Sequence, residues 1–122
     1  MKLERIRDFI AEMSAEVDKE VFDQMVGYEL DELINDTEVC ESLVKLSLLE
    51  ELGVWFDTLV KDREPHIKIM FLDRLDLWEV QGFYGYQLYS SQPWSQYGGE
   101  VIRCRARLEV ARELSSRIKG AL

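Results

Sequence analysis

The chain has 122 residues, of which 47% are apolar and 32% are charged, and its formal net charge is −9. A chain of this size and composition can bury a core as one globular domain, 1-122, and it does not belong to the disordered class. It contains neither an apolar run of the ~20 residues that a bilayer span needs nor a signal-peptide pattern. We therefore expect a cytoplasmic protein without membrane contact, whose two cysteines are free thiols.

The charge is distributed unevenly along the chain. Residues 1–60 carry sixteen acidic and five basic side chains, a net charge of −11, whereas residues 61–122 carry eight and ten, a net charge of +2. Such a surplus is typical either of a solubilising surface or of a surface that meets a basic partner. The densest acidic run contains no base and consists of Glu29, Asp31, Glu32, Asp36, Glu38 and Glu41.

Helical patterns fill the acidic half of the chain, residues 1–64. Apolar residues recur at three- and four-residue spacing over 3–17, and a second helical pattern runs over 21–34. Gly27 lies inside the second pattern, where we expect it to mark a kink or a close packing contact.

Two capping signals divide the remainder of this half. Asp36 or Thr37 can accept a hydrogen bond from a free backbone N–H and so begin a third helix. Ser47-Leu48-Leu49-Glu50 fits a capping box, which predicts a fourth helical start at Leu48. We expect Pro65 to end the helical half.

The second half, residues 65–122, has a different pattern that is rich in aromatic residues. Short apolar segments with many β-forming residues predict three strands, at 66–72, 77–80 and 83–89. Serine, proline and glycine predict a loop over 90–99.

The last segment fits two interpretations. Apolar residues alternate with arginines over 100–106, which predicts a strand, and helical spacing follows over 107–119. One helix across the whole segment is the alternative. The predicted fold class is α+β, with an N-terminal bundle of about four helices, then a small antiparallel sheet and a C-terminal helix.

Chemical motifs are weak. Glu29, Glu32 and Asp36 would share one side of a helix, and such a stripe can hold Mg²⁺, so a metal-dependent hydrolase is an alternative function. We nevertheless expect no metal and no cofactor. A second carboxylate pair, Glu38-x-x-Glu41, follows the first after only five residues, which are too few for a hairpin that would make the two pairs face each other. His66 is the single histidine, and we interpret it as a surface residue rather than a general base.

Two further groups point to binding. Trp94 and Tyr97 lie in the predicted loop at the end of an aromatic cluster, and exposed aromatic side chains are common in protein-binding surfaces; packing in the core is the alternative. Arg103, Arg105 and Arg107 would share one face of a strand. Because the pI is about 4.6, we expect these arginines to pair with the chain's own acids or with a second copy, not with nucleic acid.

These observations favour a small acidic, non-enzymatic interaction protein that binds the basic surface of a protein partner. A bacterial or viral inhibitor that mimics nucleic acid is one form of this function. The partner-binding residues would be the acidic run together with Trp94 and Tyr97. A self-associating structural subunit, possible homodimer included, and an adaptor or chaperone are further alternatives.

Overall fold

The computed structural model describes residues 2–27, 29 and 36–122, and every regular element within these ranges is an α-helix. The helices, which form an all-α four-helix bundle, are α1 (Leu3–Met25), α3 (Thr37–Lys61), α4 (Ile67–Ser90) and α5 (Trp94–Gly120). The predicted α+β fold is therefore wrong. Within the described ranges, no helix combines the length and the apolar character that crossing a membrane requires.

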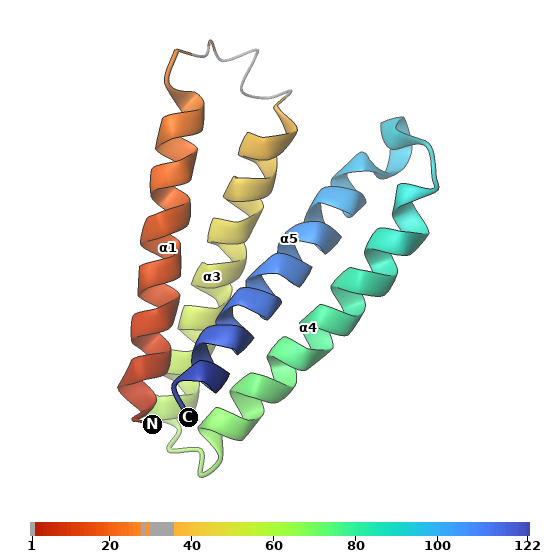
Figure 1. Cartoon of the computed structure of the whole chain (residues 1–122). Helices are drawn as coiled ribbons and strands as arrows, with labels where there is room; N and C mark the ends of the chain where they lie inside the picture. The colour runs from red at the N-terminus through yellow and green to blue at the C-terminus, as the bar shows by residue number, and fades with distance from the viewer. Residues whose placement is uncertain (1, 28, 30–35) are drawn as a thin grey trace.

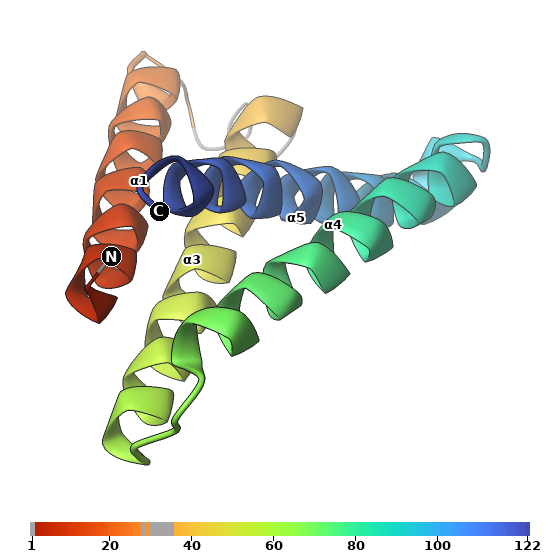
Figure 2. The same ribbon diagram turned by 60° about the horizontal axis from the view of Figure 1, so that its bottom comes forward.

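The helices form two hairpins. α1 lies beside α3, and α4 lies beside α5, while α5 also packs against α3 and α1. The chain termini lie at one end of the molecule, and the hairpins diverge toward the other end, so that the far end of α1 and α3 lies apart from the α4–α5 turn (Figures 1 and 2).

α1 confirms the predicted helix over 3–17 and continues beyond it. Its buried residues recur at three- and four-residue spacing, which places them on one face: Ile6, Phe9, Ile10, Met13, Val17 and Val21. The helix ends at Met25, and Gly27 has a backbone φ of +83°, a conformation that glycine adopts without strain. Gly27 therefore lies beyond the end of α1 and forms neither the predicted kink nor a close packing contact, since an added Cβ would meet no atom within 4 Å. Residues 21–25 of the predicted second helix belong to α1, and its residues 28 and 30–34 lie outside the described residues.

α3 begins where the sequence predicted a cap. The Asp36 side chain accepts a hydrogen bond from the Val39 backbone N–H at 3.0 Å. The predicted new start at Leu48 is wrong, since α3 is continuous for 25 residues. Ser47 and Glu50 are exposed in the helix interior, and no glycine or proline interrupts it there, so propagation adds a backbone hydrogen bond at each residue.

α4 replaces all three predicted strands. Its buried residues lie four, four, three and four residues apart, a helical period: Ile67, Phe71, Leu75, Trp78 and Gly82. The β-branched and aromatic residues that suggested strands are tolerated because tertiary packing overrides a weak local propensity.

α5 is one helix across the segment whose interpretation was open. The strand over 100–106 is wrong, the helix over 107–119 belongs to the longer α5, and only three residues, 91–93, separate α5 from α4. Because α5 packs against all three other helices, it buries a wide arc of its surface, and the buried positions show no narrow stripe. Because apolar residues are buried around a wide arc, they alternate with arginines in the sequence, and this alternation suggested a strand.

Aromatic contacts join the two hairpins near the chain termini. Phe71 of α4 is fully buried, and its ring stacks on Trp55 and meets Phe56 edge-on, with ring centroids 5.8 and 6.0 Å apart. Arg74 lies over the other side of this cluster, 3.7 Å from the Trp55 ring centroid.

Candidate functional site

The acidic run predicted as a binding surface is not one continuous surface. Glu29 is exposed just beyond the end of α1, and Glu38 is exposed in the first turn of α3. Asp36 is half-buried and caps α3, so part of its carboxylate serves the fold. Asp31 and Glu32 lie outside the described residues.

Glu41 is withdrawn from the surface. Its carboxylate lies 2.6 Å from the Nη2 of Arg105 and accepts a second hydrogen bond from the Arg105 Nε at 2.9 Å. The hydrogen bond to Glu41 raises the pKa of the Arg105 guanidinium. The pair joins α3 to α5, and Glu41 is not available to a partner.

Additional acidic residues of α1 lie at the same end of the molecule. Asp18, Glu20 and Asp23 are exposed and, within the described part of the chain, form no ion pair. The end of α1 and the beginning of α3 lie side by side, far from the chain termini (Figure 1). We call this surface the acidic tip; it comprises Asp18, Glu20, Asp23, Glu29 and Glu38.

Exposed apolar side chains accompany the acidic tip. Phe22 is 71% exposed, Val26 is 66% exposed and Met25 is 41% exposed. Asp18 and Phe22 lie four residues apart and so share one face of α1, and the apolar row ends with Val26, the C-cap residue, whose backbone is extended. The sequence pattern had placed these apolar residues in a buried stripe. The sequence could have indicated this exposure, because one narrow face of a helix cannot bury two consecutive residues such as Val21 and Phe22.

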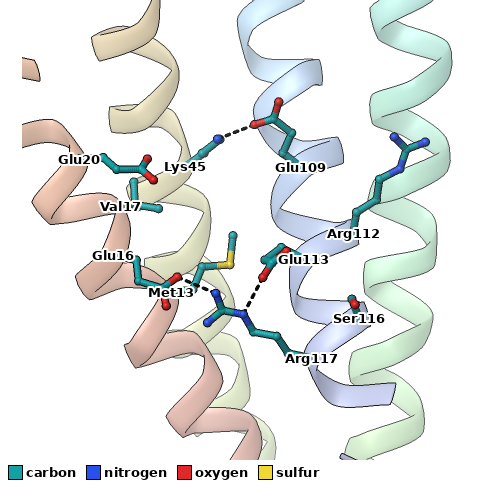
Figure 3. A pocket seen from close by; sticks show the side chains of 10 residues that line it. All are labelled: Met13, Glu16, Val17, Glu20, Lys45, Glu109, Arg112, Glu113, Ser116 and Arg117. Carbon is teal, nitrogen blue, oxygen red and sulfur yellow. Dashed lines mark hydrogen bonds and ion pairs between the residues drawn. The ribbon is translucent and has the colours of Figure 1, made fainter. Parts of the chain in front are cut away.

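A groove of about 580 Å³ lies between α1, α3 and α5, and charged side chains cross it (Figure 3). Arg117 of α5 contacts Glu16 of α1 at 2.6 Å and Glu113 of its own helix at 2.8 Å. Lys45 of α3 lies 2.5 Å from Glu109 of α5. The hydrogen bonds to Glu16 and Glu113 raise the pKa of the Arg117 guanidinium, which stays charged.

Most of the carboxylates in the groove are engaged in ion pairs. Three of its four carboxylates are already paired with a cation, so they are poor ligands and poor general bases. Across the described ranges, no three His, Cys, Asp or Glu side chains are grouped to hold a metal ion. Of the stripe considered as a metal site, Glu29 and Asp36 lie outside the helices of the described ranges, and Glu32 lies outside the described residues.

The predicted aromatic binding loop is the first turn of α5. Tyr97 is half-buried and stacks on Tyr89 across the α4–α5 turn, with ring centroids 5.6 Å apart. Trp94 is 56% exposed, and its indole covers Gly98, where an added Cβ would lie 2.7 Å from the ring. The structure therefore places Tyr97 in the hairpin packing and leaves only Trp94 largely open to solvent.

The three arginines do not form a row, because residues two apart in a helix point to different sides. Arg105 pairs with Glu41, Arg103 pairs with Glu100, and Arg107 lies 5.5 Å from the ring centroid of Trp78. The expected pairing with the chain's own acids is confirmed for Arg103 and Arg105.

Two remaining polar candidates are accounted for by the fold. His66 is exposed at the N-cap position of α4 and makes no side-chain capping bond. No disulfide joins Cys40 and Cys104, as expected, and burial raises the pKa of the Cys104 thiol. A raised pKa leaves less of the reactive thiolate at neutral pH.

Comparison with protein-family models, with curated proteins and with solved structures finds no match to this chain. The acidic tip with its apolar row is thus a candidate site that rests on geometry and charge alone.

Proposed function

We propose that this chain is a cytoplasmic, non-enzymatic interaction protein whose acidic tip binds the basic surface of a protein partner. The observation that carries the proposal is the exposure of Phe22 on α1 and of Val26 just beyond its end, both about two-thirds exposed. They accompany Asp18 and Asp23 of α1, which form no ion pair within the described ranges. Carboxylates attract and orient a basic partner, and desolvated apolar side chains supply most of the affinity.

The position of the charges supports the tip more than other acidic surfaces. Elsewhere in the acidic half, Arg5 pairs with Glu12 at 3.3 Å and Arg7 pairs with Asp57, so these two carboxylates are already matched by a cation. At the tip, Lys19 lies among five carboxylates, and Lys45, which lines the same groove as Glu20, is already paired with Glu109. A field of this kind extends about one Debye length, 8–10 Å, into the solvent at physiological salt.

A nucleic-acid-binding enzyme is the kind of partner that this chemistry fits best. The groove of such an enzyme presents lysines and arginines to phosphates, and a rigid helix end that presents carboxylates can occupy the same groove. The chain would then act as an inhibitor that competes with nucleic acid.

Charge reversal at the tip tests the proposal. The chain would be immobilised to capture its partner from an extract of its native cells, and the rates would then be measured with the purified partner at several salt concentrations. Asp18→Lys with Asp23→Lys should slow association about tenfold and flatten its salt dependence. Asp62→Lys with Glu64→Lys, the same charge change at the opposite end, should have little effect. Asp36 is left unchanged because it caps α3.

The apolar part of the site is tested through dissociation. Phe22→Ala should speed dissociation, since loss of a buried aromatic anchor acts mainly on the off-rate. Trp94→Ala, which removes another exposed aromatic side chain, serves as the control on the α4–α5 hairpin. Excess duplex DNA should displace the chain if the partner's basic surface is a nucleic-acid groove. Unchanged rates and salt slope for the doubly reversed tip would leave the acidic tip a solubilising surface only.

A further inference from the structure

A second exposed apolar surface lies on α4, away from the acidic tip. Leu77, Val80, Phe83, Tyr84 and Leu88 recur at three- and four-residue spacing and are between 39% and 65% exposed. The ring centroids of Phe83 and Tyr84 lie 5.5 Å apart in an edge-on contact, which joins them in one surface. We call these five side chains the α4 stripe.

The α4 stripe faces away from the molecule's own core. The opposite side of α4 carries the buried residues, from Ile67 to Gly82, and packs against α5 and, near its beginning, against α3. In both views α4 is the outer helix of the bundle, with α1 on the far side (Figures 1 and 2). The stripe therefore has no covering element among the described helices.

The size of the stripe sets the kind of contact that it can make. With about 150–250 Å² for a large side chain, the five residues together expose on the order of 500 Å². Patches of about 300–600 Å² on a monomer are often functional. Two such stripes would bury about 1,000 Å², near the lower limit for a specific interface, so the contact would be reversible.

The charges along α4 favour pairing with an identical helix in one direction. Asp73 and Asp76 are exposed in the first half of the outer face, whereas Gln87 in its second half and Ser91, the residue that follows the helix, are uncharged. In a parallel pair, Asp73 and Asp76 would face their own copies and repel. In an antiparallel pair centred near residue 82, the acidic half of each helix faces the uncharged half of the other.

We propose that two copies of this chain associate through the α4 stripe, with the two α4 helices antiparallel about a two-fold axis. Val80 of each copy lies opposite Tyr84 of the other, and Leu77 lies opposite Leu88. Such an arrangement is self-complementary, as a two-fold interface requires. It uses no residue of the acidic tip, so the dimer would still present two tips to partners.

The association is tested with the full chain by sedimentation velocity over a range of concentrations. Wild-type protein should change from monomer to dimer with a midpoint of about 10–100 μM, as a small interface predicts. Val80→Glu places one carboxylate from each copy at the centre of the contact and should weaken the dimer by about tenfold or more. Val54→Glu is a matched control, because Val54 is 62% exposed on α3 and the charge change is identical.

The direction of pairing is tested by adding a charge at the end of α4. In the antiparallel dimer, Ser91→Lys places an ammonium opposite Asp73 and should tighten association about two- to threefold. In a parallel dimer the two introduced ammonium groups would lie close together, and their repulsion would weaken the dimer. Adding Asp73→Asn to Ser91→Lys should remove the gain.

Three outcomes would overturn the proposal. The wild-type chain could remain monomeric to several hundred micromolar, in which case the stripe serves another partner. Val54→Glu could weaken the dimer as much as Val80→Glu, which would assign the association to net charge. Ser91→Lys could weaken the dimer, which would exclude the antiparallel arrangement. Circular dichroism of each variant verifies that the helices are intact.

Discussion

The two hairpins of this bundle are held together in different ways. α1 and α3 meet through large buried side chains, among them Phe9, Leu49 and Leu52. α4 and α5 approach more closely at Gly82, where an added Cβ would lie 2.7 Å from the Cys104 backbone oxygen. The bundle therefore combines two kinds of helix packing. Large side chains fill the space between α1 and α3, whereas the backbones of α4 and α5 approach each other closely.

The largest effect is expected where the hairpins meet. Phe71→Ala should lower the free energy of unfolding by about 3–5 kcal/mol, because it leaves a cavity beside Trp55 and Phe56. Phe22→Ala, an identical change at a side chain that is 71% exposed, should alter it by less than about 0.5 kcal/mol. Urea unfolding of both variants measures the difference, and equal values would contradict this packing of Phe71.

A glycine-to-alanine pair sharpens the contrast between the hairpins. Gly82→Ala should destabilise the protein by about 1–3 kcal/mol, since the methyl group meets the backbone of α5. Gly53→Ala should instead stabilise it by up to about 1 kcal/mol, because alanine favours helix and the nearest atom, Cγ2 of Ile10, is 3.9 Å away. Thermal unfolding of the two variants should therefore shift in opposite directions. A shift of the same sign would show that close approach does not distinguish the α4–α5 hairpin.

The ion pair between the hairpins should contribute less than the aromatic contacts. Glu41→Gln should cost about 1–2 kcal/mol, a value reduced because about a third of the Arg105 side chain is exposed to water. Glu12→Gln removes the carboxylate of an exposed pair with Arg5 and should cost less than about 0.5 kcal/mol. Chemical unfolding of both variants at low and high salt tests the ranking, and salt should diminish the Glu12 effect more.

The smallest effect concerns the thiol beside the close approach. Because burial raises the pKa of Cys104, the folded state favours the neutral thiol. The resulting stabilisation is complete below the ordinary thiol pKa and is lost as the pH rises through the raised pKa. Cys104→Ala should therefore flatten the alkaline side of the stability profile. Alkylation of Cys104 in native protein should also be slower than in urea, as peptide mapping can verify; equal rates would contradict the burial.

The sequence determined the helices of α1 and α3 largely by itself. Ile6 to Val17 keep a strict helical period, and Asp36 marks the beginning of α3 with a side-chain cap. These signals are local, so no knowledge of the rest of the fold is needed to interpret them. The predicted break at Leu48 failed because a capping pattern also occurs in the interior of a continuous helix.

For the candidate site, the sign of the charge could be predicted from the sequence, but not which carboxylates are available to a partner. Glu41 belongs to the same acidic run as Glu38, yet Arg105, 64 residues away in the chain, neutralises it. Phe22 and Val26 resemble core residues until the buried face of α1 is known. Burial and pairing depend on which distant side chains come together, and local spacing does not encode that.

From the sequence alone we could predict that the first half of the chain is acidic and helical and that one of its helices begins with a side-chain cap at Asp36. That α4 and α5 are helices could be seen only from how they pack. α5 lies against three neighbouring helices, and α4 approaches α5 closely at Gly82. α5 is buried on several sides and so loses the narrow apolar stripe, whereas α4 carries apolar residues on its exposed face as well as on its buried face. The aromatic and β-branched residues of both helices then suggest strands. The physical reason is that long-range packing, worth several kcal/mol per buried side chain, outweighs local propensities of less than about 1 kcal/mol per residue.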